Sequence, residues 1–340
     1  MNGYQRCAAA LRGEPTDATP VMLHNFMMAA REAGLTMREF RSDPRQIARA
    51  FSESMDRYGY DGIMVDIDTA TLAAAVGFPV EYPEDEPAVC RGARLSSLAE
   101  VDELPPPDVG KCERVQVWLE AVRLLKKEFG NEVFIRGNCD QAPFSLATLM
   151  RSAEGWMLDL MEPDNEAPAF RLLDYCYEAG TQFLRLMAGT GCDMLSNGDS
   201  SAGSSLISPR LHRKFAHSHE KRMAAFAHEL GLPYAQHVCG NARPILADLV
   251  ASGADAVELD FKTDSQAAHD ALAGRATLIG NIDPTGVMAM GTPELVAEKC
   301  RELMAIFGDT PRLILNAGCA LPATTSPENL KEMIRTAHGG

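Results

Sequence analysis

The chain has 340 residues, 46% of them hydrophobic and 23% charged, which is typical of a globular enzyme with a sizeable core. Its formal net charge of −15 argues against nucleic acids and anionic membranes as partners, because both attract clustered positive charge. The nine scattered cysteines form no CxxC pair, the first residues lack the apolar core of a signal peptide, and no apolar run approaches the length of a membrane span. We therefore expect a cytoplasmic protein without a disulfide framework.

Taken in chain order, apolar runs alternate with helical patterns about eight times. The predicted strands are 20–24, 62–68, 133–137, 193–197, 233–239, 256–260, 277–281 and 312–316. The predicted helices are 4–11, a stretch that ends near 40, 44–58, 112–129, 142–160, 167–190, 208–230, 244–251, 267–272, 292–307 and 326–337. Such alternation calls for a parallel sheet. The leading prediction is an α/β fold, a (β/α)8 TIM barrel that forms one domain over residues 1–340.

A doubly wound open sheet is the alternative fold, and it is weakened because no GxGxxG turn follows the first strand. Two segments fall outside the repeating units. Residues 4–11 form a helical extension before the first strand. Residues 78–110, which follow the second strand, are rich in proline and acidic side chains. We expect an irregular excursion there, with at most a short hairpin.

One short motif, His237-Val238-Cys239, ends the fifth predicted strand. Side chains two apart on a strand point to the same face, so the imidazole and the thiol emerge side by side. A second thiol, Cys319, follows the eighth predicted strand. These are ligands that zinc prefers, and three of them leave one tetrahedral position open, as in catalytic sites. Taken alone, the His-x-Cys motif favours a core histidine beside a buried free cysteine over a metal site.

The predicted barrel makes a metal site the favoured interpretation of this motif. Active sites of such barrels lie at the carboxyl ends of the strands. The fifth and eighth strands are three positions apart in a ring of eight, so their ends face each other across the mouth. We therefore predict a metal site formed by His237, Cys239 and Cys319 over the barrel axis.

Other polar residues also follow predicted strands. Of these, Asp66 and Asp199 are the predicted catalytic residues, because neither immediately precedes a helix that it would cap. The others are Asp68, Asn138, Asp140, Asp260, Asn281 and Asp283. For every one of these side chains, a helix cap or a turn is the alternative role.

Three residues are predicted to contact the substrate. Met27 and Met28 follow the first strand and indicate an apolar pocket for an uncharged or aromatic substrate, although methionines mostly fill cores. Asn281, at the end of the seventh strand, is the third. The segment 217–220 (His-Ser-His-Glu) resembles a metal site, but it lies within a predicted helix, where residues two apart do not share a face. We expect it to be a solvated polar face.

With these residues in place, the chain resembles the uroporphyrinogen decarboxylase superfamily, and within it the zinc-dependent, cobalamin-linked methyltransferases. The resemblance spans nearly the whole chain, and its carriers are the stretch through 20 and the segments 208–209, 237–240, 280–284, 318–322 and 326–330. In those methyltransferases a His-x-Cys pair and a late cysteine bind zinc. The resemblance therefore implies zinc at His237, Cys239 and Cys319, and a partner corrinoid protein that presents cobalt.

The sequence departs from the decarboxylases of this superfamily. They carry paired arginines after the first strand, whereas this chain has Met27, Met28 and a single Arg31 there. The resemblance implies transfer of a methyl group between a corrinoid and a thiol, a methyl ether or a methylamine-type donor, in either direction. Two alternatives stay open. One is a metal-free decarboxylase, which Asp66 would suit, and the other is a catalytically silent barrel that binds a corrinoid protein.

Overall fold

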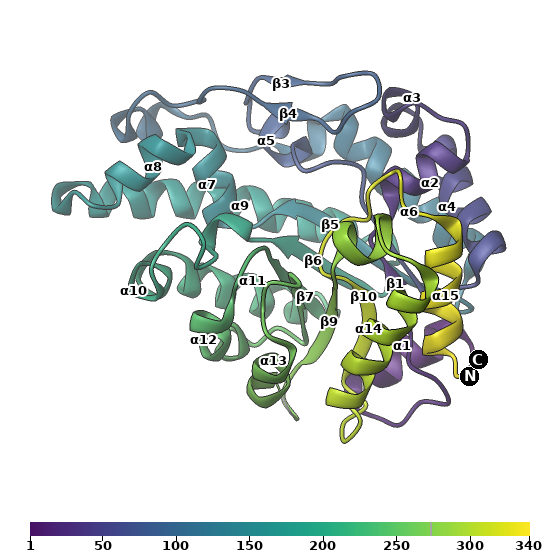
Figure 1. Cartoon of the computed structure of the whole chain (residues 1–340). Helices are drawn as coiled ribbons and strands as arrows, with labels where there is room; N and C mark the ends of the chain where they lie inside the picture. Colours follow the sequence, from purple (N-terminus) through teal and green to yellow (C-terminus); the bar gives the residue numbers. More distant parts are fainter. Residues whose placement is uncertain (273) are drawn as a thin grey trace.

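Eight parallel strands form the centre of the computed structural model, which describes residues 1–272 and 274–340 (Figure 1). The strands are β1 (Met22–Leu23), β2 (Gly62–Val65), β5 (Phe134–Gln141), β6 (Met194–Gly198), β7 (Tyr234–Val238), β8 (Ala256–Leu259), β9 (Thr277–Ile282) and β10 (Leu313–Ala317). Each strand pairs with the next in this order. A bridge between Val21 and Leu315 joins the first strand to the last, so the predicted barrel is confirmed.

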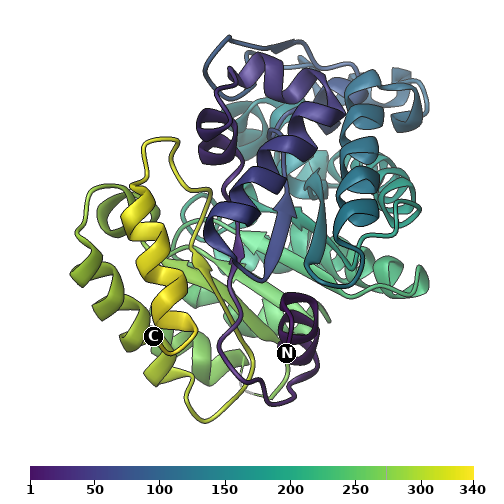
Figure 2. The same cartoon turned by 90° about the vertical axis from the view of Figure 1, so that its right-hand side faces the viewer.

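Helices surround this sheet (Figures 1 and 2). They are α1 (Gly3–Arg12), α2 (Phe26–Glu32), α3 (Met37–Ser42), α4 (Pro44–Tyr58), α5 (Thr71–Ala75), α6 (Glu113–Phe129), α7 (Pro143–Arg151), α8 (Ala153–Asp159), α9 (Glu166–Ala188), α10 (Pro209–Leu211), α11 (His217–Glu229), α12 (Leu246–Ala251), α13 (Ser265–Leu272), α14 (Pro293–Ile306) and α15 (Pro327–Ala337). Within the described residues, no helix is both long enough and apolar enough to cross a bilayer.

Local sequence signals explain many helix boundaries. In α4, the Asp43 side chain accepts a hydrogen bond from the backbone N–H of Arg45, Pro44 occupies the first turn, and Gly59 ends the helix in the left-handed region with φ 66°. The predicted helix 142–160 is instead two helices, α7 and α8, because Ser152 adopts φ 68° between them and caps the second. The predicted stretch that ends near 40 likewise divides into α2 and α3.

The two segments outside the repeating units have the expected forms. A short antiparallel hairpin, β3 (Val80–Glu81) with β4 (Val89–Cys90), lies within the proline-rich excursion. Helix α1 closes the amino-terminal end of the barrel. Its buried residues pack in one apolar cluster with residues at the starts of the strands; this cluster contains Cys7, Ala10, Leu11, Met22, Phe134, Met194, Ala235, Ala256, Ile279 and Ile314. The carboxyl ends of the strands are left to form the functional end.

Asp61 connects three segments of the chain at this closed end of the barrel. Its buried carboxylate accepts hydrogen bonds from the backbone of Val21 and from Arg6, at 2.8 and 2.9 Å, and lies 2.8 Å from His338.

Replacement of Asp61 by alanine leaves three polar groups without their partner, so we expect a loss of about 2–4 kcal/mol in the free energy of unfolding. The matched control is Asp17→Ala. Asp17 also pairs with Arg6, but on the surface, so urea unfolding should show an almost unchanged midpoint for this variant. Equal losses in the two variants would contradict this role of Asp61.

Candidate active site

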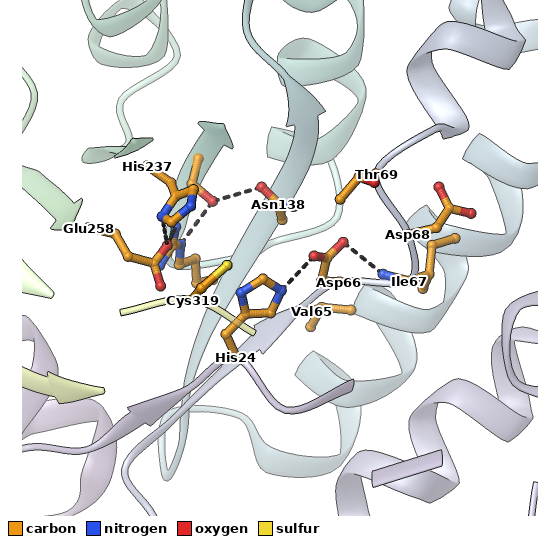
Figure 3. A network of polar contacts seen from close by, with 12 residues as sticks. His24, Val65, Asp66, Ile67, Asp68, Thr69, Asn138, His237, Glu258 and Cys319 are labelled. Atoms are coloured by element: carbon orange, nitrogen blue, oxygen red, sulfur yellow. Dashed lines mark hydrogen bonds and ion pairs between the residues drawn. The ribbon is translucent and has the colours of Figure 1, made fainter. Parts of the chain in front are cut away.

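A cavity of about 260 Å³ opens at the carboxyl ends of the strands. It is lined by His24, Phe26, Met27, Met64, Asp66, Asp68, Thr69, Pro87, Asn138, Asp140, Gln141, Gly198, Ser200, His237, Cys239, Cys319 and Ala320. One wall carries sulfur and imidazole groups, and another carries three carboxylates. Figure 3 shows His237 and Cys319 on one side of the network, with Asp66 and Asp68 on the other.

The structure brings His237, Cys239 and Cys319 together. His237 Nε2 lies 3.1 Å from Cys239 Sγ, the two sulfur atoms are 4.0 Å apart, and all three candidate ligand atoms lie within 4.8 Å of one another. Two sulfurs bonded to one tetrahedral zinc at ~2.3 Å would be ~3.8 Å apart. The spacing therefore suits a single metal ion, and it arises because the ends of β7 and β10 converge across the mouth.

A buried acidic residue lies behind the imidazole. Glu258 Oε2 is 3.4 Å from His237 Nδ1 (Figure 3) and 2.8 Å from an Arg136 guanidinium nitrogen. The other carboxylate oxygen of Glu258 accepts a hydrogen bond from Asn316 at 2.9 Å. Because Nδ1 faces this carboxylate, Nε2 points toward the two sulfurs. The sequence analysis missed Glu258 and Arg136, although each is a charged residue within an otherwise apolar strand.

The cluster is electrostatically coupled. The hydrogen bond from Cys319 lowers the pKa of Cys239 against the opposing effect of burial, and the same bond raises the pKa of Cys319. Burial lowers the pKa of His237, but the neighbouring Cys239 thiolate outweighs burial and raises it well above the usual value. The pKa values of the three groups therefore depend on one another, and a metal would bind the deprotonated forms and displace protons from the cluster.

The carboxylate wall begins with Asp66, one of the two predicted catalytic residues. Asp66 lines the cavity, and its Oδ2 lies 2.7 Å from His24 Nε2 (Figure 3). The Asp66 Oδ1 atom accepts a hydrogen bond from the backbone of Ile67 at 2.8 Å. His24 Nδ1 is buried and has no hydrogen-bond partner among the described residues. The sequence analysis did not select His24; its position at the end of the first predicted strand was the available signal.

Asp199, the other predicted catalytic residue, lies elsewhere. It is 1% exposed and is not among the described residues that line the cavity. Its Oδ1 accepts a hydrogen bond from the backbone of Ser145 at 2.8 Å, and its Oδ2 has no partner in the described part of the chain. Burial, and then the nearby Glu220, raise the pKa of Asp199 well above its ordinary value. This position suits a supporting role behind the cavity wall rather than contact with a substrate.

The expectation of a solvated face at 217–220 is wrong. Glu220 and His219 are 1% and 3% exposed. Glu220 lies 3.2 Å from His212, and His219 lies 3.1 Å from Asp174. Both residues lie on the buried stripe that regular helical spacing gives, which consists of positions 212, 215, 216, 219, 220, 223, 224 and 227. Their polar groups are buried because His212 and Asp174 provide partners there.

Of the three residues predicted to contact the substrate, one is among the described residues that line the cavity. Met27 lines the cavity, as expected. Met28 is 1% exposed and belongs to the main hydrophobic core. Asn281 is buried and donates a hydrogen bond to the Thr263 backbone carbonyl at 2.9 Å, while its side-chain oxygen accepts one from Ser265 at 3.0 Å. Asn281 therefore fixes the loop between β8 and α13, and neither Asn281 nor Met28 is among the described lining residues.

Comparisons with known proteins agree on the family. A family model described as uroporphyrinogen decarboxylase (URO-D) matches residues 3–340. Methylcobamide:CoM methyltransferase MtbA of Methanosarcina acetivorans is 25% identical over 338 residues, covering 98% of this chain and 96% of that protein. A uroporphyrinogen decarboxylase of Alkalilimnicola ehrlichii is 26% identical over 355 residues, covering 98% and 93%. A solved methyltransferase structure from Methanosarcina mazei has a TM-score of 0.90 at 22% identity, covering 99% and 98%, and shows the same fold.

The buried Asp199 generates a pH-dependent prediction. A carboxyl group whose pKa is raised in the folded state favours folding while it is protonated, and it loses this contribution as pH rises through the folded pKa. Replacement by asparagine keeps the Oδ1 acceptor and removes the charge. We therefore expect Asp199→Asn to raise the Tm by a few degrees at about pH 8 and to change it little at about pH 4.

Thermal unfolding of Asp199→Asn across this pH range checks the prediction. The matched control is the exposed Asp164→Asn, which should give the same small difference at each pH. A loss of stability in Asp199→Asn that is equal at every pH would show that the charge of Asp199 is required for folding.

Proposed function

Because this chain belongs to the uroporphyrinogen decarboxylase family, we propose that it is a zinc-dependent methyltransferase of that family, which moves a methyl group between a small substrate and the cobalt of a corrinoid protein. The observation that carries the proposal is the convergence of His237, Cys239 and Cys319 in one cavity. The likeness to MtbA, a methylcobamide:CoM methyltransferase, supports the same reaction class over nearly the whole chain.

The residues present fit zinc by two criteria. The donor set, one imidazole nitrogen and two sulfurs, is one that zinc prefers, and it leaves a position for a substrate. Glu258 faces the other nitrogen of His237 at 3.4 Å, which is the arrangement that orients zinc-bound histidines in many proteins. Bound zinc would supply Lewis-acid chemistry, by making a thiol more acidic or by polarising the heteroatom that carries the methyl group.

The remaining cavity residues would form the wall against the substrate and move a proton. Asp66 orients His24 through the contact at Nε2, so that the unpartnered Nδ1 can take a proton from the substrate or return one to it. Met27, Phe26 and Met64 provide an apolar part of the wall and limit access of water to the reacting atoms. In this proposal Asp66 is a positioning residue and His24 is the proton carrier.

The corrinoid is presented by a partner protein that docks over the mouth of the barrel. The formal charge of −15 suits a partner with a basic surface. A reducing cytoplasm would keep Cys239 and Cys319 available as thiolates.

A decarboxylase is the second candidate, because relatives with that name match most of the chain and Asp66 lies in the cavity. A polycarboxylated substrate would require a basic wall. The described residues that line the cavity include no lysine or arginine. The methyltransferase is therefore favoured, and it is also favoured over a silent barrel, because a complete set of zinc ligands has no purpose in a protein that only binds a partner.

Metal analysis of the purified protein tests the site. We expect about one zinc per chain, lost in Cys239→Ala and in Cys319→Ala, because two remaining ligands bind zinc weakly. The matched control is Cys176→Ala, since Cys176 is fully buried and lies outside the cluster. Mass spectrometry of the metal content, before and after addition of zinc, gives the answer. Zinc retained by both cluster variants, or absent from the wild type even after addition, would overturn the proposal.

The zinc-loaded protein should also demethylate methylcobalamin in the presence of thiols, or form it from an aryl methyl ether and reduced cobalamin. Absorbance of the corrinoid follows both reactions. Cys239→Ala should lose this activity, whereas Cys176→Ala should keep it. Decarboxylation of a porphyrinogen by protein freed of metal would instead establish the second candidate.

Glu258 provides a further prediction. Replacement by glutamine removes the charge that orients His237, so we expect zinc affinity to fall about 10–100-fold. Glu220→Gln is the matched control, because Glu220 is a second buried glutamate beside a histidine, His212, outside the cluster. Competition with a metal chelator measures both affinities. Similar losses in the two variants would point to general destabilisation instead.

A further inference from the structure

The carboxylate wall of the cavity bears on which small molecule enters it. We propose that the substrate of this site carries a cationic, ammonium-type group, which Asp68 and Asp140 bind, and that anionic thiols are disfavoured. The inference rests on the proposed function and specifies its substrate class. It differs from the apolar substrate that Met27 and Met28 indicate in the sequence.

Asp68 and Asp140 are built into the wall and are still incompletely paired. They are 0% and 3% exposed, and both line the cavity. Asp68 Oδ1 accepts a hydrogen bond from the backbone of Thr71 at 2.8 Å, and Asp140 Oδ2 accepts one from Leu72 at 2.7 Å, so both are anchored at the start of α5. The other oxygen of each carboxylate has no hydrogen-bond partner among the described residues. Two buried acceptors in one wall require a donor, and a cation is the best donor for them.

The pKa shifts of Asp68 and Asp140 also favour a cationic substrate. Burial raises the pKa of Asp68 and of Asp140, and the charge of Asp68 raises that of Asp140 further. Asp66, in the same wall, raises both. An ammonium group beside them would stabilise the ionised forms, whereas a sulfonate or carboxylate would add a like charge at a site that already resists charge.

Two arginines act electrostatically on this wall from outside the cavity lining. Arg114 and Arg41 lie over the ring of Tyr82, at 3.5 and 5.5 Å from its centre, and the Arg41 guanidinium donates to the backbone carbonyls of Pro83 and Glu86. Arg114 lowers the pKa of Asp68, but less than burial raises it. Neither arginine is among the described lining residues, so neither presents its charge to a substrate.

This wall suits coenzyme M poorly. Coenzyme M, which the name of the relative MtbA includes, is 2-mercaptoethanesulfonate and carries a full negative charge. On the wall described here its sulfonate would meet Asp68 and Asp140 without a cation. A thiol of the same length that ends in an ammonium group would instead bring a cation to this wall, where the unpartnered carboxylate oxygens can accept hydrogen bonds from its N–H groups.

Three thiols of matched length test the inference: 2-aminoethanethiol (cysteamine), 2-mercaptoethanol and 2-mercaptoethanesulfonate, which differ in charge. Their binding to the zinc-loaded, full-length protein is measured by calorimetry, and kcat/KM for methyl transfer from methylcobalamin is measured in parallel. We expect cysteamine to exceed 2-mercaptoethanol by at least about tenfold in both measurements, and the sulfonate to fall at least about tenfold below it, which is ~1.4 kcal/mol at each step.

Asp68→Asn and Asp140→Asn should reduce the preference for cysteamine over the sulfonate by about tenfold or more. The matched control is Asp283→Asn. Asp283 follows β9 and caps the next helical turn in the same way, but it lies outside the cavity lining, so the preference should not change. Asparagine keeps an acceptor at each position, and the comparison of thiols in the wild type does not depend on the variants.

The binding measurement and the methyl-transfer measurement distinguish a failure of this inference from a failure of the proposed function. Preferred binding of cysteamine without methyl transfer would support the carboxylate site and remove the methyltransferase. Methyl transfer with equal or better use of the sulfonate would keep the methyltransferase and overturn the inference. Binding of none of the three thiols would also overturn it.

Discussion

A buried ion pair inside the barrel is the interaction on which the site depends. Arg136 of β5 and Glu258 of β8 are both fully buried and are 2.8 Å apart. Burial of two charges costs more than their attraction returns unless other groups complete their hydrogen bonds. Here Ser196 accepts from Arg136 at 2.8 Å and Asn316 donates to Glu258 at 2.9 Å, so four strands share the network. One nitrogen of Arg136, Nη1, has no hydrogen-bond partner among the described residues. The result is a carboxylate at a fixed position behind His237.

That network determines how the His237 side chain is oriented. The barrel brings the ends of β7 and β10 together, but a histidine at a strand end can still rotate. Glu258 faces Nδ1 of His237, which leaves Nε2 beside the Cys239 sulfur at 3.1 Å. Burial raises the pKa of Glu258, but Arg136 and His237 outweigh burial and lower it, so the carboxylate stays charged. His237, the proposed zinc ligand, is therefore held in one orientation, which would reduce the conformational entropy lost on metal binding.

Periodicity and local caps are the features of this fold that can be predicted from the sequence. The order of strands and helices, the Asp43 cap of α4 and the meeting of the fifth and eighth strand ends depend on patterns that a chain shows directly. The partners of buried charges do not. Glu258 pairs with Arg136 across 122 positions of the chain, and only the closed sheet brings them together. The environment of Glu220 was misjudged for a related reason, because its position on the buried stripe of α11 depends on a buried partner, His212, that periodicity alone does not reveal.

The cavity also shows how one barrel can serve different reactions. Its two walls have different chemistry: sulfur and imidazole at the ends of β7 and β10, and carboxylates after β2 and in β5. A decarboxylase acting on a polycarboxylate needs positive charge where this chain has Met27 and the buried acids. The same strand ends can therefore carry opposite charge without any change in the fold, because side chains at strand ends contribute little to the core. In this chain, the charge of the cavity wall is therefore more informative about the substrate than the likeness over the whole chain, which extends to a methyltransferase and to a decarboxylase alike.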